Sequence, residues 1–460
     1  MDRIVILQVT YSPPVQRLIK IPTTDEWERF KTYTRRVVEL HVGGTFGWGV
    51  SSETISFLGM QSAVDPLWAG LTSLRLHEPG WETVAFALAF LSPKIQTLSL
   101  ILPRDTSILL HPILSVASDR CHSIQKLVLD IVVDDSHSAH RVGGLISACR
   151  DTLRVLDIRS PYKTEYLPII ADLPQLRVLC LERVHSLFNV PFDCFPALEE
   201  FTFPHLQESQ VGYSPGCQIG YFLKRLGTRR LKVAKIYSTT AVGFWGLVHG
   251  LSRFSTSLRD LEITAIESLN FSSYPCCRPT PIMSLRNVQL WCLPWEVTSH
   301  KPCPLLLSDE TVAKLGAVMP NLTHLTLGSP TCPELQCTTF RSLVSLSETC
   351  RNLETLEIKV DLRTMVAPPL SVSESKSVGT GAISDKTGDH PCKLRRLVVG
   401  LSTLPDLPES GWIVAAGLRG IFPSLREVEG CGRERSKWEQ VCENIRMFRQ
   451  VLRTVGSLGA

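Results

Sequence analysis

The sequence predicts an α/β fold in which strand–helix units stack in a row, and two observations carry this prediction. An apolar phrase of the form L-x-x-L-x-L recurs along almost the whole chain, and segments with helical spacing fill most of the intervals between phrases. The last four residues of each phrase alternate between apolar and polar, which is the period of a strand that is buried on one face. A single unit of this kind cannot bury its own apolar face, so neighbouring units must stack.

The clearest phrases begin at Leu153, Leu176 and Leu198, at intervals of 23 (176 − 153) and 22 (198 − 176) residues. These intervals lie within the ~20–29-residue period of leucine-rich repeats. The other phrases begin at Val37, Leu71, Ile95, Ile124, Leu231, Leu258, Leu285, Leu322, Leu353, Leu394 and Leu425. Because the intervals reach 41 residues (394 − 353), we predict an irregular leucine-rich-repeat solenoid, with a curved parallel sheet on the concave side and helices on the convex side.

The elements follow in order. Residues 1–36 are expected to form an N-terminal flank and a capping helix that begins after Thr23 and carries Trp27 and Phe30. Residues 37–430 are expected to form the repeats. Helices are predicted before eight of the phrases, at 83–91, 109–118, 142–149, 166–171, 242–254, 309–318, 340–348 and 411–420.

Two segments stand outside the repeats. Residues 367–392 are rich in Ser, Gly and Lys, and we expect a disordered insertion there. Residues 431–460 are expected to form an amphipathic helix with Trp438, Val441 and Ile445 on its apolar face and several arginines on the other. Such a basic helix is typical of a membrane surface or a calmodulin target, or it covers the last repeat of a solenoid; we favour the cap.

Composition narrows the function classes. A net charge of only +4 indicates no strong attraction to nucleic acid or membrane, so we expect neither as a partner. The longest apolar run, Val84–Leu91, is too short to span a bilayer, and the N-terminus is a poor signal peptide. Fifteen cysteines, an odd number, indicate free thiols in a reducing compartment. We therefore expect a cytoplasmic or nuclear protein that is not secreted.

Catalytic and metal-binding motifs are not evident. The chain contains no Walker loop, His-Glu-x-x-His or Gly-x-Ser-x-Gly motif and no Cys-x-x-Cys pair. The one close histidine pair, His137 and His140, follows Asp134 and Asp135 and is interpreted as part of a surface loop. The sequence thus predicts no enzyme, no cofactor and no metal site.

The better candidate for function is the concave face. In each phrase the third, fifth and seventh residues should point away from the core, because side chains alternate along a strand. Exposed Trp, Tyr and Arg are enriched among binding hot spots, so a protein partner is expected on this face. The candidate partner-binding residues are Arg75, Arg159, Glu182, Glu200, Tyr237, Glu262, Trp291 and His324.

Three stretches carry a resemblance to a known family: Pro22–Phe30, Tyr33–Val37 and Leu71–Leu76. Together with the irregular repeats they resemble the F-box/leucine-rich-repeat proteins of mushroom-forming fungi. The resemblance implies that the repeats recruit the substrate of a cullin-type ubiquitin ligase, while an F-box docks on the Skp adaptor.

Residues 1–20 lack the Leu-Pro opening and the Cys-x-x-Trp ending of an F-box, so the F-box itself is not expected in this chain. The Skp adaptor and cullin are expected as partners only if an F-box is supplied upstream. The expected function is a non-catalytic protein-recognition scaffold that resembles the substrate-binding part of such a receptor. The alternative is a leucine-rich-repeat scaffold or regulator unconnected to ubiquitin.

Overall fold

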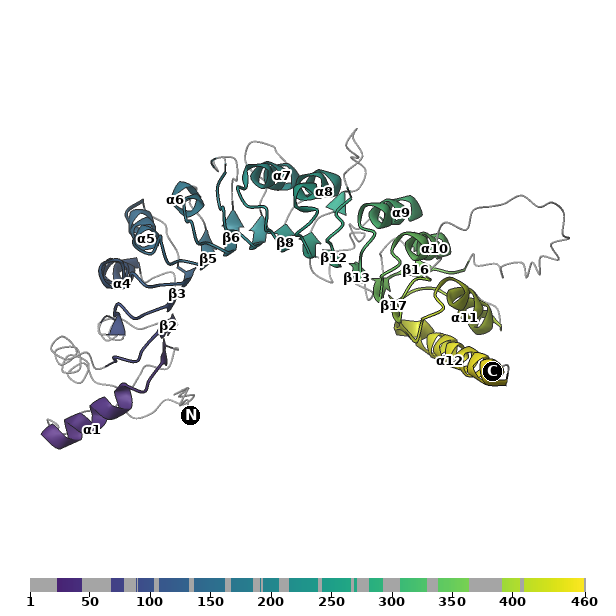
Figure 1. Cartoon of the computed structure of the whole chain (residues 1–460), viewed down its shortest axis with the longest axis horizontal. Helices are drawn as coiled ribbons and strands as arrows, with labels where there is room; N and C mark the ends of the chain where they lie inside the picture. Colours follow the sequence, from purple (N-terminus) through teal and green to yellow (C-terminus); the bar gives the residue numbers. More distant parts are fainter. Residues whose placement is uncertain are drawn as a thin grey trace. The chain divides into compact units, whose positions relative to one another are not determined.

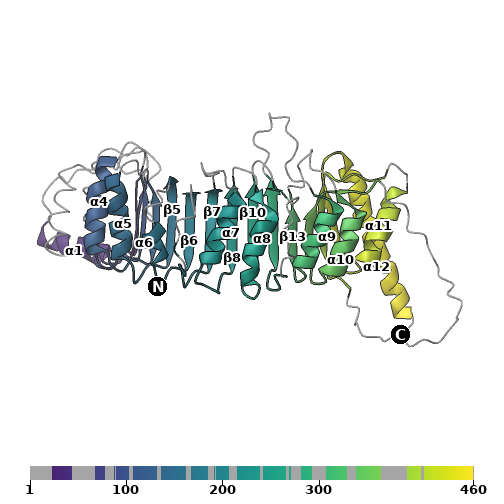
Figure 2. The ribbon, with the colours of Figure 1, turned by 90° about the horizontal axis from the view of Figure 1, so that it is seen from above.

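The computed structural model has an α/β fold (Figures 1 and 2). It describes residues 23–43, 68–77, 88, 90–102, 107–131, 136–161, 167–184, 191, 193–206, 215–238, 242–265, 269–270, 281–292, 307–328, 338–363, 391–405 and 409–458. The chain divides into two compact units. The first comprises residues 1–207 and 225–230, and the second comprises residues 208–224 and 231–460. Each unit is described by itself.

The first unit contains a parallel sheet whose strands pair in the order of the sequence. The strands are β1 (Glu39–Gly43), β2 (Ser73–His77), β3 (Thr97–Ile101), β4 (Lys126–Asp130), β5 (Val155–Pro161), β6 (Val178–Val184) and β7 (Glu200–Leu206). Its helices are α1 (Thr24–Thr34), α4 (Ser107–Arg120), α5 (Ser136–Ala148) and α6 (Leu167–Ala171). Helices α4, α5 and α6 lie on the same face of the sheet (Figures 1 and 2).

The core of the first unit consists of aligned apolar rows. The fourth residues of the phrases pair from strand to strand, as in Leu74 with Leu98 and Leu98 with Leu127. All three are fully buried, and so are their counterparts Leu156 and Leu179 further along the sheet. The register thus stacks the leucines of successive phrases, and the strand predictions for this unit are confirmed.

The second unit repeats this plan. Its main strands are β8 (Val233–Ser238), β10 (Asp260–Ala265), β12 (Asn287–Cys292), β13 (His324–Leu327), β15 (Thr355–Ile358), β17 (Arg396–Gly400) and β18 (Glu427–Gly430), paired in parallel in that order. Its helices are α7 (Pro215–Arg225), α8 (Phe244–Leu251), α9 (Asp309–Val318), α10 (Phe340–Thr349), α11 (Ser410–Ile421) and α12 (Arg435–Leu458). Helices α7 to α11 lie on one face of these strands (Figure 1).

Two short parallel pairs flank this main sheet. Strand β9 (Val242–Gly243) pairs with β11 (Leu269–Asn270), and β14 (Thr338–Thr339) pairs with β16 (Val360–Asp361). Strands β9 and β14 lead directly into helices α8 and α10, so each pair fixes the point at which a helix begins.

Helix α9 begins where the sequence predicts. The Ser308 hydroxyl accepts a hydrogen bond from the Thr311 N–H at 3.2 Å, which satisfies one of the free donors of the first turn. The adjacent Asp309 carboxylate holds the start of α10 instead: it accepts bonds from the Thr339 N–H (2.8 Å), the Thr339 hydroxyl (2.5 Å) and the Ser342 hydroxyl (2.5 Å). Burial of Asp309 raises its pKa, but these bonds outweigh burial and leave the pKa below its usual value.

Helix α7 has no counterpart among the helices expected from the sequence. Its first residue is Pro215, and Gly216 and Gly220 lie within it, so the local composition is typical of a loop. Proline is compatible with the first helical turn, where its missing N–H would have no partner. Ile219, Phe222 and Leu223 are fully buried at helical spacing, and this packing determines the conformation.

Helix α12 covers the last strand of the second unit. Trp438, Val441 and Ile445 are buried, and the helix packs against both β18 and α11. Further along, Phe448 is half-buried and makes a T-shaped contact with Trp412, and Val451 is 58% exposed. The first half of the helix therefore shields the edge of the sheet.

Several expectations fall on residues that the structure leaves undescribed. Residues 1–22 and most of the helix expected at 83–91 lie outside the described ranges, as do residues 367–390 of the expected insertion. The described chain resumes at Pro391, and the next residue, Cys392, is buried with its Sγ 3.5 Å from the Cys350 carbonyl oxygen.

Candidate functional site

The candidate site is the face of each sheet that the helices leave open (Figure 1). On every main-sheet strand except β1 and β18 the fourth and sixth residues of the phrase are buried, so the third, fifth and seventh point to the other side. In β2, for example, Leu74 and Leu76 are buried whereas Arg75 and His77 are exposed. We call these surfaces the helix-free face of the first unit and the helix-free face of the second unit.

Arg75 lies in a polar cluster at the start of the first unit. Its Nη2 is 3.0 Å from Glu39 Oε1, and the same carboxylate oxygen accepts from the Ser73 hydroxyl at 3.3 Å. His41 Nε2 lies 3.0 Å from it as well. The hydrogen bond from His41, together with the charge of Arg75, holds the Glu39 pKa below its ordinary value. Glu39 is therefore charged and shared among three neighbours.

Arg159 lies on β5 and pairs with Asp157 of the same strand. Its Nε donates to Asp157 Oδ2 at 3.1 Å, and this bond raises the Arg159 pKa. The other oxygen, Asp157 Oδ1, is buried without a hydrogen-bond donor among the described residues. Glu200 on β7 is half-buried beside Val178 of β6. Glu182 belongs to β6, but its side chain is outside the described part of the structure.

Tyr237 and Glu262 are brought together in the second unit. Their strands, β8 and β10, are neighbours, and the Tyr237 hydroxyl donates to Glu262 Oε1 at 2.6 Å. Trp291 on β12 is aligned with Thr264 of β10, which is itself aligned with Tyr237. The backbone thus places Tyr237 and Trp291 two strands apart on one row, although the Trp291 side chain is not described.

His324 is exposed on β13, next to Asn287 in the register. Its Nδ1 lies 2.9 Å from the Thr323 hydroxyl. Asn287 in turn donates a hydrogen bond to Asp260 on the next strand. The candidates of the second unit therefore fall on neighbouring strands, and hydrogen bonds link their surroundings.

Sequence reasoning missed one strong pair on this face and misplaced one residue. Arg396 on β17 donates from Nε and Nη2 to the two oxygens of Glu429 on β18, at 3.1 and 2.9 Å. Glu429 escaped notice because the last phrase keeps only Leu425 and Val428 of its apolar residues. Lys359 is the seventh residue of the phrase at Leu353, so alternation predicts it on the open face. It is only 6% exposed, because the chain turns there into β16, where the Lys359 carbonyl oxygen accepts a hydrogen bond from the Thr338 hydroxyl.

Glu357 lies on the same face, on β15 between β13 and β17. Burial raises its pKa, while a 3.4 Å hydrogen bond from the Thr326 hydroxyl and the charge of Arg396 act against burial. Glu429 nearby adds repulsion. A partner that supplied a positive charge here would stabilise the ionised form.

The described residues hold no group of three or more His, Cys, Asp and Glu side chains placed to bind a metal ion. His137 and His140, expected in a surface loop, belong instead to helix α5, where Ala139, Val142 and Leu145 supply buried apolar residues. The loop prediction was therefore wrong, because the apolar spacing that follows the aspartates extends further towards the N-terminus than expected.

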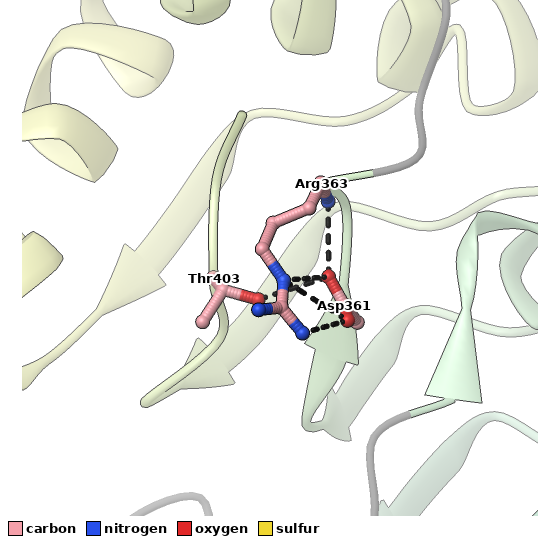
Figure 3. Close-up of polar contacts among 3 residues, drawn as sticks. All are labelled: Asp361, Arg363 and Thr403. Carbon is pink, nitrogen blue, oxygen red and sulfur yellow. Dashed lines mark hydrogen bonds and ion pairs between the residues drawn. The ribbon is translucent and has the colours of Figure 1, made fainter. Parts of the chain in front are cut away.

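A second polar cluster is structural (Figure 3). Asp361 accepts from the Arg363 guanidinium at 2.6 to 3.2 Å and from the Arg363 N–H at 3.0 Å. The Thr403 hydroxyl donates to the same carboxylate at 3.0 Å. Led by the Arg363 side-chain bonds, these contacts lower the Asp361 pKa to about 2. The Arg363 contacts lie within one segment, whereas the Thr403 bond joins Asp361 of β16 to the segment after β17.

The cysteines that the structure describes are free thiols, and most are buried. Burial raises the pKa of Cys121, Cys149 and Cys194 to about 12 and that of Cys350 to about 11. Cys350 Sγ lies 3.6 Å from the Met319 carbonyl oxygen, a weak hydrogen bond between repeats. These thiols act as small apolar residues of the core.

No family model matches the chain, and a search of curated proteins finds no significant match. Among the described helices, none has the length and apolar character needed to cross a lipid bilayer.

Proposed function

We propose that this chain is a non-catalytic protein-recognition scaffold with an irregular leucine-rich-repeat solenoid, resembling the substrate-binding part of an F-box ubiquitin-ligase receptor. The observation that carries the proposal is the in-register stacking of successive phrases in each unit, with helices on one face and polar side chains on the other. In a solenoid of this type the helix-free face is the concave side, and extended concave surfaces are where such proteins bind their partners.

The composition of the face supports a protein partner. On the helix-free face of the second unit, charges of both signs are interleaved with Tyr237. On that of the first unit, charges are interleaved with the half-buried apolar side chains of Val155 and Val178. Protein interfaces commonly combine aromatic and arginine anchors with a polar rim. The proposal includes a cytoplasmic or nuclear location, and it takes the Skp adaptor and cullin as further partners if an F-box is supplied upstream.

Affinity capture from the cell extract of the source organism tests the proposal. The face variant combines Arg159→Glu, Glu262→Arg and Trp291→Ala. Its control combines Lys314→Glu, Glu310→Lys and Trp412→Ala on the helical side, where Lys314 and Glu310 form an exposed pair and Trp412 is 44% exposed. Both variants change one acid, one base and one tryptophan.

Proteins that the wild type and the control variant retain, and that the face variant loses, are the expected result. A face variant that retains every partner overturns the proposal. The same experiment distinguishes the two functional alternatives. Recovery of the Skp adaptor and cullin with the wild-type protein supports the connection to a ubiquitin ligase. Specific partners without them support the alternative, a scaffold or regulator unconnected to ubiquitin.

A further inference from the structure

A row of basic residues follows one edge of the sheet in the second unit. The row is formed by the second residue of each phrase, immediately before the strand begins. From β8 to β18 these residues are Lys232, Arg259, Arg286, Thr323, Glu354, Arg395 and Arg426. Five of the seven are basic, one is acidic, and all five basic side chains are exposed. We call these five residues the basic ladder.

The backbone places the members of the ladder side by side. The Arg259 N–H donates to the Lys232 carbonyl oxygen at 2.8 Å, and the Arg286 N–H donates to the Arg259 carbonyl oxygen at 2.8 Å. The Arg426 N–H makes the same bond to Arg395 at 2.8 Å. Adjacent strands are ~4.8 Å apart, so like charges repeat at that spacing in a run of three and a run of two.

In the part of the chain that the structure describes, no acidic partner neutralises the four arginines of the ladder. Within the described residues, the side chains of Arg259, Arg395 and Arg426 form no ion pair or hydrogen bond. The Arg286 Nη1 donates to the Asn321 carbonyl oxygen at 2.9 Å. This acceptor is neutral, so it orients the guanidinium without compensating its charge. Like charges on neighbouring strands are destabilising, so an anion bound across them would relieve this repulsion.

The helix-free face of the same unit differs in this respect. There Arg396 is paired with Glu429, and Glu262 accepts from Tyr237. The corresponding edge of the first unit carries fewer bases: its residues are Val38, Thr72, Gln96, Gln125, Arg154, Arg177 and Glu199. Its two bases are neighbours, because the Arg177 N–H donates to the Arg154 carbonyl oxygen at 2.8 Å. The edge of the second unit therefore carries a run of three basic residues and a run of two, whereas the edge of the first unit carries a single run of two.

We propose that the basic ladder binds an acidic segment of a protein partner, whose carboxylates bridge neighbouring arginines. The fork of an arginine side chain matches a carboxylate with two parallel hydrogen bonds, and the ladder presents such forks in sequence. Binding of single-stranded nucleic acid relies on aromatic side chains for base stacking, and the seven edge residues include none. The inference rests on the proposed recognition function only in taking a protein as the partner.

Fluorescence anisotropy with the full chain tests the ladder directly. The probe is a labelled peptide of alternating glutamate and serine, with a lysine–serine peptide and an oligothymidylate as comparisons. The ladder variant is Arg259→Glu/Arg286→Glu. The control, Arg435→Glu/Arg446→Glu, makes the same charge change at exposed positions of α12. Circular dichroism checks that both variants fold.

The expected result is salt-sensitive binding of the glutamate peptide. Its Kd should rise about ten-fold or more in the ladder variant, where a ten-fold change corresponds to ~1.4 kcal/mol. Binding should change less than about two-fold in the control. Three results would overturn the proposal: no binding by the wild type, an equal loss in the control, or tighter binding of the oligothymidylate than of the peptide. None of these results bears on capture through the helix-free face, which uses other residues.

Discussion

The indole Nε1 of Trp438 donates a hydrogen bond to the carbonyl oxygen of Ser402 at 3.2 Å. The Ser402 hydroxyl also accepts from the Val360 N–H at 2.6 Å, and all three residues are buried. One turn after β17 thus links the C-terminal helix to the strand β16 of the preceding repeat. The terminal helix is therefore part of the hydrogen-bonded core of the second unit.

Removing the Trp438 side chain should destabilise the second unit severely. Trp438 is 1% exposed and packs on Gly430, where an added Cβ would lie 2.3 Å from the indole. Trp438→Ala should lower the free energy of unfolding by about 3–5 kcal/mol, the usual cost of deleting a buried large aromatic side chain. Urea unfolding measures the change. Trp412→Ala, at a position 44% exposed, is the control and should cost clearly less; equal costs would show that α12 is not a cap.

The hydrogen bonds of the Asp361 carboxylate should make the stability of the protein fall at acid pH. Its pKa is lowered from 3.8 to about 2, so the ionised form is favoured by folding. Its contribution is fully present above pH 3.8 and is lost as the pH falls towards about 2. Asp361→Asn should therefore be less stable than the wild type at neutral pH, and the gap should close across that window. Thermal unfolding at several pH values measures the gap, and a pH-independent gap would argue against these hydrogen bonds.

Glu357 should make stability depend on pH in the opposite direction from Asp361. Burial raises its pKa above 4.5, so the folded state favours the protonated form. The stabilising effect is present below pH 4.5 and is lost as the pH rises through the raised pKa. Glu357→Gln should be at least as stable as the wild type at neutral pH and should lose that advantage in acid. Melting temperatures of the two proteins at pH 4 and pH 7 test this; a variant less stable at neutral pH would contradict it.

The buried thiols should resist alkylation while the protein is folded. With a pKa of about 12, Cys121 and Cys149 carry about one ten-thousandth thiolate at pH 8, and the thiolate is the reactive form. Among the cysteines that the structure describes, iodoacetamide followed by peptide mass spectrometry should modify the half-buried Cys180 and Cys431 first, and the buried ones only in urea. Labelling of Cys121 at the rate of Cys431 in the native protein would contradict this expectation.

The strands formed by the phrases could be predicted because each depends on local spacing. The phrase that contains Leu74 and Leu76, or Leu261 and Ile263, buries its fourth and sixth residues in the structure as expected. Helix α7 could not be predicted in the same way, since Pro215 and its glycines indicate a loop and only the packing of Phe222 shows otherwise.

The candidate site was less predictable than the fold. Alternation along β2 and β10 places Arg75 and Glu262 on the open face, but it does not reveal their partners. The bond between Tyr237 and Glu262 depends on which strands are neighbours and on their register, and the two residues are 25 positions apart in the sequence. Lys359 was misplaced for a related reason, because the short pair of β14 and β16 has no signature of its own.

Site-specific photo-crosslinking tests the central claim most directly. A photoreactive amino acid is placed at Gln289, exposed on the helix-free face of the second unit, or at Ala317, exposed on helix α9. Each protein is irradiated in cell extract, and cross-linked proteins are identified by mass spectrometry. If the helix-free face recognises a protein, a specific adduct should form from Gln289 and not from Ala317. An adduct from Ala317 with none from Gln289 would contradict the proposed function.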